Sequence, residues 1–310
     1  MTTRTGGFSP LLAPGLRKVY FDEQKRRPSE YQTMFNVLSS TRAYEEEYEL
    51  SMLGGAFPAK PEGTNIEFVD PLTGLTNRYT HATFGLGFRI TEEMYEDDLY
   101  GPMKKMSSGL AKCSTNEVEY QAAGVVDNAS VNTYYVGFDD LALASTAHKL
   151  LSGQTAPPNL RGGMAATYAN RPSSYGALGI TTLQAAILRM EKTPDPDGVL
   201  CLVKPKLLFI PADLRFVAKE ILKSEYKPYT ANNEINPVVD EGITYFVWHF
   251  LASTTMWGMI GDTNPLNFFW RRKDKFDNSD DFDSGDAKFK ATHRHSQGFS
   301  DWRGFDLGST

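Results

Sequence analysis

The segment Val199–Leu222 constrains the fold of this chain more than any other stretch. Its first half holds two apolar runs separated by Lys204-Pro205-Lys206, which favours a buried strand. After Pro211 the apolar residues change to the spacing of one helix face. These residues are Leu214, Val217, Ala218, Ile221 and Leu222. A buried strand that leads directly into an amphipathic helix predicts the centre of a compact α/β domain.

Composition limits the classes of protein to which the chain can belong. Its 310 residues suffice for one large or two medium domains, and 41% hydrophobic with 23% charged residues is typical of a globular protein. The sequence has neither the long apolar run of a transmembrane helix nor the apolar segment of a secretory signal. Cys113 and Cys201 are far apart, which favours a reducing compartment over a disulfide framework. The net charge of −6 disfavours a dedicated nucleic-acid binder.

The N-terminal region has little from which to build a core. Residues 1–16 are polar and punctuated by Gly and Pro, as in a flexible or partner-ordered tail. Leu16–Ser51 is rich in charge and carries few large apolar residues, so we expect an extended or helical arm that lies on another surface. Truncation from Gly15 to Ser51 should then impair assembly more than folding.

A long hairpin is expected after this arm. Thr64–Val69 alternates like a strand, Asp70–Gly74 has the Pro and Gly of a tight turn, and Leu75–Ile90 is a second β-prone run. The tip carries little apolar surface, and an isolated hairpin is marginally stable in water. We therefore expect this hairpin to rest on a neighbour.

The middle of the chain is predicted to be helical and then irregular. A helix begins at Thr91, is interrupted at Gly101-Pro102, and resumes as the longest helix of the chain, from Met103 to about Asn128. Tyr134–Gly179 has the composition of a loop, and loops of this length are usually functional or ordered by a partner.

The last third predicts one more helix and two long strands. Thr181–Gln184 has the pattern of a capping box, which predicts a helix that ends before Pro194. Asn264–Phe276 is β-prone, and an acidic loop separates it from an alternating run near the C-terminus. In that run Phe289, Ala291, His293 and His295 share one face.

Candidate catalytic and metal-binding residues are few. His293 and His295 could hold Zn²⁺ or Cu²⁺, but no Cys or carboxylate stands at a familiar ligand spacing. The acidic run around Asp281 and Asp283 lacks the Gly and Glu of an EF-hand loop, so a solvated hairpin tip explains it better. Motifs for activated nucleophiles, phosphate loops and zinc proteases are missing. We expect no enzyme, no cofactor and no metal site, with a metal-dependent hydrolase as a distant alternative.

Five stretches, in order and nearly from end to end, resemble the major capsid proteins of tailed bacteriophages. They are GLRKVYFDE at Gly15–Glu23, RYTHATFGLGFRITEEMYEDDLYG at Arg78–Gly101, STAHKL at Ser145–Leu150, KPKLLFIPADL at Lys204–Leu214 and HRHSQGFSDWRG at His293–Gly304. Each motif alone is only weakly specific for this family, whereas the five in this order are strongly specific for it.

The resemblance implies the α+β fold of tailed-phage capsid shells. That fold has an N-terminal arm, an extended β-hairpin loop, a peripheral domain with a long spine helix, and an axial domain of mixed sheet with flanking helices. The expected boundaries are residues 1–54 for the arm, 55–90 for the hairpin loop, 91–145 and 266–304 for the peripheral domain, 146–265 for the axial domain and 305–310 for a tail.

The resemblance also implies a structural function. Subunits of such proteins form pentamers and hexamers that close into an icosahedral head shell around double-stranded DNA, so the expected location is the virion, after assembly in the host bacterial cytoplasm. The implied partners are other copies of the chain, a scaffolding protein, a portal protein, a decoration protein and packaged DNA in non-specific contact, with no membrane. An encapsulin-like shell that encloses protein cargo shares the fold and remains an alternative. Since the sequence starts at its own Met1 without a scaffolding extension, we expect a separate scaffolding protein and no maturation cleavage.

Subunit-interface candidates come from the arm, the hairpin, the first helix, the long loop and the C-terminal motif. They are Tyr20, Phe21, Arg26, Asp70, Pro71, Arg78, Tyr79, Glu92, Asp97, Asp98, Arg161, Trp302 and Arg303. A charge at Val217 or Ile221 should abolish folding, whereas changes in Asp70–Gly74 should spare folding and disturb shells.

Overall fold

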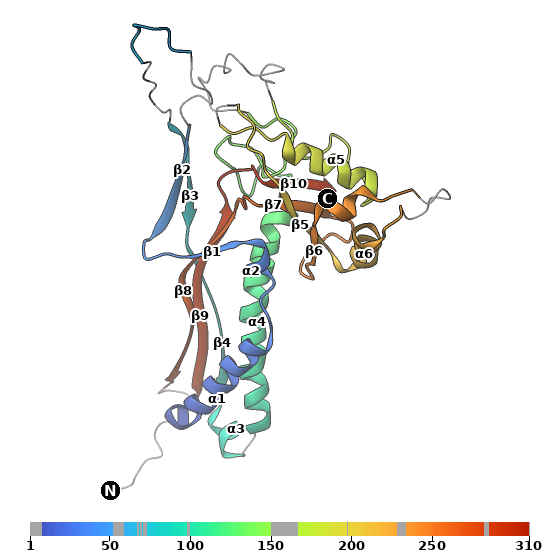
Figure 1. Cartoon of the computed structure of the whole chain (residues 1–310). Helices are drawn as coiled ribbons and strands as arrows, with labels where there is room; N and C mark the ends of the chain where they lie inside the picture. Colours follow the sequence, from blue (N-terminus) through green and yellow to red (C-terminus); the bar gives the residue numbers. More distant parts are fainter. Residues whose placement is uncertain are drawn as a thin grey trace.

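The computed structural model describes residues 8–51, 59–66, 68, 70, 73–97, 100–149, 167–196, 198–227, 234–281 and 285–309. These residues form an elongated stem, a body at one end of the stem, and a two-stranded ribbon beside the body (Figure 1). Helices and strands are mixed along the chain, which confirms the α+β class.

The stem is a long helix packed on a four-stranded sheet. The helix is α4 (Tyr100–Asp127), the longest of the described residues, as predicted. The sheet has the order β1-β8-β9-β4. Its strands are β1 (Asn36–Ser39), β8 (Leu266–Asp280), β9 (Ala287–Phe299) and β4 (Ala82–Ile90). Small buried side chains of α4, among them Ala122, Ala123 and Val126, let the helix approach the sheet closely.

The alternation predicted for the C-terminal run is confirmed in β9. Phe289, Ala291, His293 and His295 are buried beneath α4, and the residues between them face outward. We expected Gly101-Pro102 to interrupt the helix, and this expectation is wrong. The pair lies in the first turn of α4, where proline removes no intrahelical hydrogen bond. The short helix α3 (Glu92–Glu96) precedes it, and its Met94 N–H is accepted by Thr91 Oγ1 at 3.4 Å.

The body is a second four-stranded sheet with helices beside it. The sheet order is β10-β7-β5-β6. Its strands are β5 (Pro205–Ile210), β6 (Thr244–Val247), β7 (Trp257–Gly261) and β10 (Phe305–Ser309). The helices are α5 (Ile180–Glu191) and α6 (Arg215–Lys223), and short 3₁₀ turns lie at Ala212–Leu214 and Pro237–Glu241.

The predicted strand–helix unit is confirmed in its helix and in the second apolar run of its strand, which is β5, and is wrong for the first apolar run. Ala218, Ile221 and Leu222 are buried against Leu208 and Ile210, as the helical spacing indicated. The run from Val199 to Lys204 is not part of the strand. Leu200 and Leu202 are exposed, and Leu202 adopts a positive φ of 52°.

Two further expectations about secondary structure are wrong, and one about a loop is confirmed. Phe305–Ser309 is not a tail but β10, a fully buried strand paired with β7, and a bidentate ion pair between Arg189 and Asp306 fastens it to α5. The helix α5 begins one residue before Thr181, and Thr182 Oγ1 instead accepts the Gly179 N–H at 2.9 Å. In the described parts of Tyr134–Gly179 the pairing is limited to an isolated bridge between His148 and Tyr168, as expected of a loop.

The hairpin pairs differently from the prediction. The ribbon consists of β2 (Tyr44–Leu50) and β3 (Thr73–Thr80) in antiparallel pairing, whereas β4 pairs with β9 inside the stem. The described residues of Thr64–Val69 are not in a strand. The first strand of the ribbon, β2, therefore comes from the region that we assigned to the arm.

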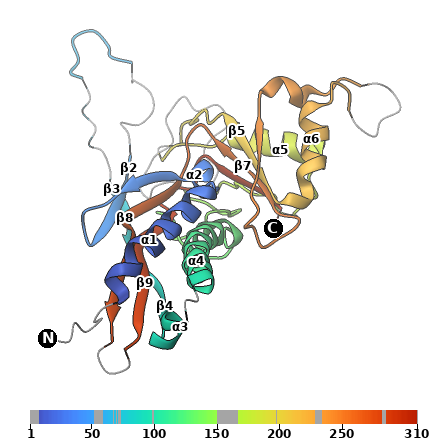
Figure 2. The same ribbon diagram turned by 90° about the horizontal axis from the view of Figure 1, so that it is seen from below.

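The N-terminal arm rests on its own subunit. The helix α1 (Phe8–Arg26) runs along α4, as Figure 2 shows, and is followed by α2 (Tyr31–Met34) and β1. Leu16 and Tyr20 are fully buried in the stem, and Ser107 Oγ donates a hydrogen bond to the Leu16 carbonyl at 2.7 Å. The expectation that this region contributes no core is therefore wrong, and its removal should damage folding as well as assembly.

Candidate subunit-interface surfaces

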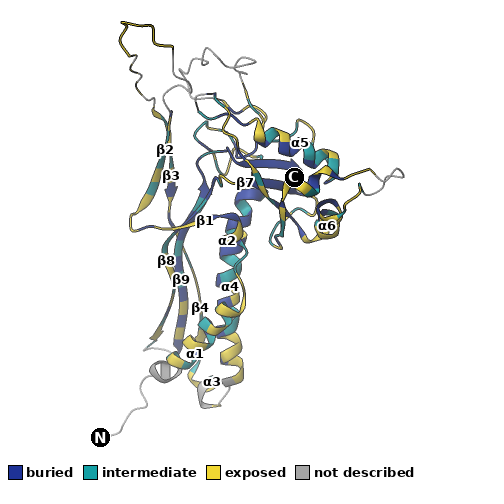
Figure 3. Cartoon of the chain, in the orientation of Figure 1, coloured by how far each residue is buried: buried dark blue, intermediate teal, exposed yellow. Residues whose placement is uncertain are grey.

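The first strand of the ribbon turns three glutamates inward and several large apolar side chains outward. Along β2 the residues alternate between half-buried and exposed, as Figure 3 shows by colour. The half-buried residues are glutamates, Glu45, Glu47 and Glu49, which face the rest of the subunit. Tyr48 and Leu50 face solvent instead, with exposed fractions of 65% and 46%. The side of β2 turned to water therefore carries large apolar side chains beside the charged pair of Glu46 and Arg78.

Glu47 fastens the middle of the ribbon to the stem. Its carboxylate accepts hydrogen bonds from Asn267 Nδ2, at 3.1 and 3.2 Å, and from Ser300 Oγ. Tyr79, on the paired strand β3, is buried and lies within hydrogen-bond distance of both Ser300 and Glu47. Burial raises the pKa of Tyr79, so its hydroxyl stays protonated at neutral pH.

Glu49 fastens the other end of the ribbon, which leads to residues 51–72, through Arg303. The Arg303 side chain is 3% exposed and donates from Nη1 to Glu49 at 3.2 Å and to Asp301 at 2.9 Å. Its Nε donates to the Pro194 carbonyl of the body at 2.7 Å. Burial raises the pKa of Glu49. A single guanidinium thus joins the ribbon to the body.

Large apolar side chains are exposed on the ribbon and in the segment between its strands. On the strands they are Tyr44, Tyr48, Leu50 and Leu75, and between the strands they are Ile66 and Phe68, of which Phe68 reaches an exposed fraction of 93%. Arg78 covers part of Tyr44, with its guanidinium carbon 4.2 Å from the ring centroid, and pairs with Glu46. An apolar surface of this extent on a thin ribbon is typical of a contact with another protein.

Residues 30 and 31 connect the arm, the stem and the body. Glu119 of α4 is buried, and its carboxylate accepts the backbone N–H groups of Glu30 at 2.7 Å and Tyr31 at 3.0 Å. Burial raises the pKa of Glu119 to about 7. The Glu30 carboxylate accepts the backbone N–H of His249 at 2.9 Å and pairs with its Nδ1 at 2.7 Å.

The two histidines of the sequence motif pack inside the stem. His293 Nδ1 lies 2.9 Å from the Asp274 carboxylate and 3.2 Å from Ser114 Oγ. The His295 ring stacks on Phe84, with the centroids 4.8 Å apart, and burial lowers the pKa of His295 to about 4. In the part of the chain that the structure describes, no group of three or more His, Cys, Asp or Glu side chains is placed to hold a metal ion.

The interface candidates from the sequence divide into three groups. Tyr20, Tyr79, Trp302 and Arg303 are buried inside their own subunit, and the Trp302 ring stacks on His148 at 4.2 Å. Arg26, Asp70, Arg78, Glu92 and Asp97 are exposed, and Phe21 is half-buried beside Tyr20. Pro71, Asp98 and Arg161 lie outside the described residues.

The sequence reasoning missed Glu47, Glu49 and Glu119. The run Tyr44–Leu50 looked like a solvated charge cluster because glutamate is usually exposed. The tyrosine and leucine residues at every second or fourth position, Tyr44, Tyr48 and Leu50, were the available signal. Both cysteines are exposed and unpaired. None of the described helices is long and apolar enough to cross a bilayer.

Solved structures share this fold over most of the chain. The procapsid protein of bacteriophage JBD30 is 13% identical, with a TM-score of 0.50, over 98% of this chain and 76% of its own. The capsid protein of the native GTA particle is 11% identical, with a TM-score of 0.55, over 91% and 90%. A virus-like particle from Pyrococcus furiosus is 8% identical, with a TM-score of 0.50, over 94% and 97%. These likenesses show the fold.

A match to a protein-family model shows to which family with this fold the chain belongs. A search of curated proteins found no match. The model described as phage capsid protein matches residues 74–305, which is well over half of the chain and includes most of the ribbon's second strand, the stem and the body. The chain belongs to the phage capsid protein family, and its role is that of a structural, non-enzymatic subunit of a phage head shell.

Proposed function

We propose that this subunit assembles head to tail into pentamers and hexamers through the outward face of its ribbon. The observation that carries the proposal is the exposure of Tyr44, Tyr48 and Leu50 on the outward side of β2, and of Phe68 between the two strands, while Glu47 and Glu49 bind the parent subunit. A two-stranded ribbon has no core of its own, so these apolar groups gain nothing within the monomer. A neighbouring subunit would cover them.

The size of the exposed surface supports a specific contact. Full burial of one large apolar side chain contributes about 1.5–3 kcal/mol. Ile66 and Phe68 between the two strands and Tyr48 and Leu50 on β2 are at least 46% exposed. Together they would supply several kcal/mol per contact, before the cost of ordering the ribbon is subtracted.

The shape of the subunit supports head-to-tail contacts. The ribbon of one subunit cannot meet the same ribbon surface of the next and still repeat around a ring, so it must cover a different surface. Such heterologous contacts close into rings when the rotation between neighbours allows it. We propose that the stem and the body are the peripheral and axial domains of these rings.

The family relationship supports further partners. We propose that the shell forms in the host bacterial cytoplasm with a separate scaffolding protein, includes a portal protein, accepts a decoration protein and encloses double-stranded DNA. Head-shell membership of the family supports this assignment over an encapsulin-like compartment.

The test replaces the exposed ribbon side chains. In the variant Tyr48→Ser/Leu50→Ser/Phe68→Ser the subunit should fold, because these side chains make no core contacts, but it should not form shells. The matched control Tyr48→Phe/Leu50→Ile/Phe68→Leu keeps the apolar area and should assemble. Circular dichroism reports folding, and sedimentation velocity with electron microscopy reports shells. Normal shells from the serine variant would refute the proposal, and particles filled with protein cargo in infected cells would favour the encapsulin-like alternative.

A further inference from the structure

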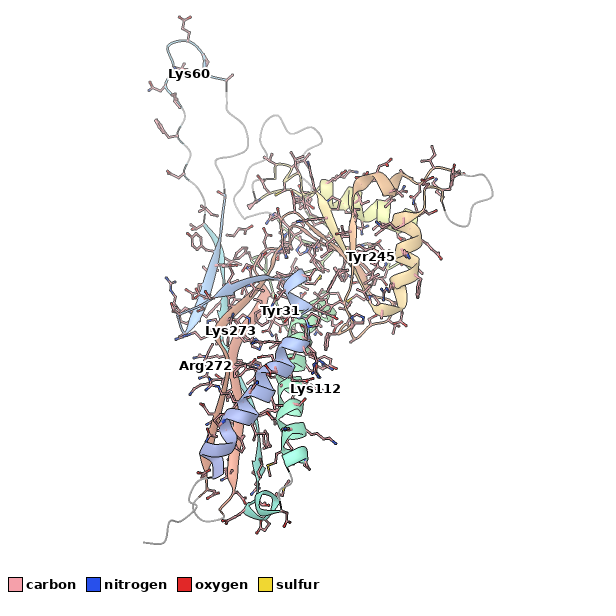
Figure 4. All side chains as sticks on the ribbon, turned by 60° about the horizontal axis from the view of Figure 1, so that its bottom comes forward. Tyr31, Lys60, Lys112, Tyr245, Arg272 and Lys273 are labelled. Carbon is pink, nitrogen blue, oxygen red and sulfur yellow. The ribbon has the colours of Figure 1, made fainter. Side chains whose placement is uncertain are left out.

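A small pocket lies in the stem, between α4 and the edge strand β4. It has a volume of about 280 Å³ and is lined by residues of α4, β4 and β9. In the view of Figure 4, α1 lies between Lys112 of α4 and the residues Arg272 and Lys273 of β8, so α1 covers the β8 side of the stem. The pocket is on the opposite side, where β4 ends the sheet.

The pocket exists because α4 covers β9 but leaves β4 partly open. Residues directly opposite each other in an antiparallel pair point to the same face of the sheet. Phe84 is paired with His293, and Leu86 with Ala291. On β9 the exposed fractions are 3% for His293 and 4% for Ala291, whereas on β4 Phe84 is half-buried and Leu86 is 55% exposed. The helix therefore leaves a gap above the edge strand.

The walls of this gap are mostly apolar. The sheet supplies Phe84, Leu86 and Ala291, and α4 supplies Leu110. Apolar walls with a few polar groups are the usual form of a small-molecule site, and the volume is near the lower end of the range of about 300–1,000 Å³ for such sites. The pocket therefore has the size and the lining for one small apolar molecule.

His293 adds an unsatisfied polar atom to the lining. Its Nδ1 lies 2.9 Å from the Asp274 carboxylate, inside the stem. Its Nε2, on another edge of the ring, is buried and has no hydrogen-bond partner among the described residues. A buried polar atom without a partner is unfavourable. Since His293 lines the pocket, an occupant of the pocket can supply the missing partner.

The other polar groups of the lining are bonded or exposed. Ser114 Oγ donates to the Asp274 carboxylate at 2.7 Å. The Glu117 carboxylate accepts a hydrogen bond from the next turn of α4 at 2.9 Å. The Cys113 thiol is exposed. The Nε2 atom of His293 is therefore the polar group of the lining that a ligand would satisfy.

We propose that this pocket binds a small apolar molecule that carries one hydroxyl group, such as a simple phenol. A hydroxyl group donates to Nε2 of a neutral imidazole ring and accepts from Nε2 of a protonated one, so it suits either state of His293. A water molecule would satisfy Nε2 but would fill only about 30 Å³ and would leave the apolar walls uncovered. This binding site is separate from the ribbon contact and does not depend on it.

The first test uses the full-length, unassembled subunit and two probes of the same shape, para-cresol and para-xylene. A hydroxyl group in para-cresol takes the place of a methyl group in para-xylene. Ligand-observed NMR should show about tenfold tighter binding of para-cresol, although para-xylene is more apolar, because para-xylene leaves Nε2 unpaired. Equal or tighter binding of para-xylene would overturn the inference, and so would the absence of para-cresol binding.

The two cysteines show where the probe binds. Cys113 lines the pocket, Cys201 lies on the body, and both are exposed. At about ten times its Kd, para-cresol should slow the alkylation of Cys113 by iodoacetamide about tenfold and leave Cys201 unchanged, as measured by mass spectrometry. Equal effects on the two cysteines would show non-specific binding and would overturn the inference.

Two variants change different walls of the pocket. Ala291→Leu fills it and should abolish para-cresol binding, and Leu86→Ala removes an exposed wall and should weaken binding severalfold. The matched control Leu188→Ala removes a leucine of similar exposure, 51%, from α5 and should bind like the parent.

Circular dichroism checks that each variant folds. If Ala291→Leu does not fold, Leu86→Ala decides, because Leu86 is largely exposed and its loss should spare the core. Parental para-cresol binding by the folded pocket variants would overturn the inference, as would an equal loss in Leu188→Ala.

Discussion

Replacing Arg303 with methionine should destabilise the unassembled subunit by about 3 kcal/mol. Methionine preserves most of the apolar volume but removes the guanidinium that is bonded to Glu49, Asp301 and the Pro194 carbonyl. The measurement is chemical denaturation of the full-length protein.

The magnitude follows from the exposure of each partner. Removing one member of a buried ion pair costs about 3–5 kcal/mol, because the other charge is left buried and unpaired. The Glu49 side chain is 11% exposed and meets this condition. Asp301 is 37% exposed, so water can solvate it and its contribution is small. The lower end of the range is therefore expected, including the lost hydrogen bond to Pro194.

A double-mutant cycle isolates the pair. Glu49→Gln in the Arg303→Met background should recover part of the lost stability, because it removes the stranded charge, and the coupling energy should be at least about 1 kcal/mol. Zero coupling would refute the anchoring role of this pair. Unchanged stability combined with a loss of shells would instead show that Arg303 works between subunits.

The remaining predictions concern pH and packing. The pKa of His295 is lowered to about 4, so the contribution of the neutral ring to stability is complete above pH 6.5 and is lost as pH falls toward 4. His295→Phe should therefore flatten the acid transition in thermal melts. An unchanged transition would count against this prediction. The pKa of Glu119 is raised to about 7, so folding takes up a proton and stability should fall as pH rises from about 4.5 to 7, whereas Glu119→Gln should remove that slope in denaturation curves. Gly304 has a φ of +89°, and a Cβ at this position would overlap the Thr263 carbonyl oxygen. Gly304→Ala should therefore lower the free energy of unfolding by about 3 kcal/mol or more. An unchanged melting temperature would contradict this prediction. Ile221→Asp should prevent folding, as judged by circular dichroism, whereas Val217→Asp should be tolerated better because Val217 is half-buried; equal effects would contradict the placement.

Elements with strong apolar periodicity could be predicted from the sequence. The spine helix α4, the strands β8 and β9 and the helix α6 lie where their patterns indicated. In each of these elements one face is buried, and burial of one face produces a spacing of apolar residues that can be seen in a single sequence.

Pairing between distant segments could not be predicted. The strand β10 contains Asp306, Gly308 and Ser309, residues that disfavour strands, and it is held by its partner β7 and by the ion pair to Arg189. The arm was misjudged for a related reason. Leu16 and Tyr20 are spaced four residues apart, and both fill the stem core although their neighbours are charged.

The ribbon shows why the proposed interface was hard to locate. Hydrophobic residues were assumed to face the subunit, yet along β2 Glu47 and Glu49 do so, because Arg303, Ser300 and Asn267 supply donors from more than 200 residues away in sequence. The inward side of a strand can be recognised only when the donors that satisfy its charges are known.

Arg303 still bears on assembly, although its side chain is buried. It bonds Glu49, near the end of the ribbon that leads to residues 51–72, and the Pro194 carbonyl of the body, and Gly304 turns the chain from the stem into β10. Together with the contacts of Glu47, this bond holds the ribbon against the stem and the body. In the proposed shell every ribbon reaches the same place on its neighbour, so loosening the Glu49 contact would let the outer end of the ribbon move. Variants that stay folded but loosen the Arg303–Glu49 pair should consequently yield shells of irregular size, which electron microscopy can measure, before they yield none.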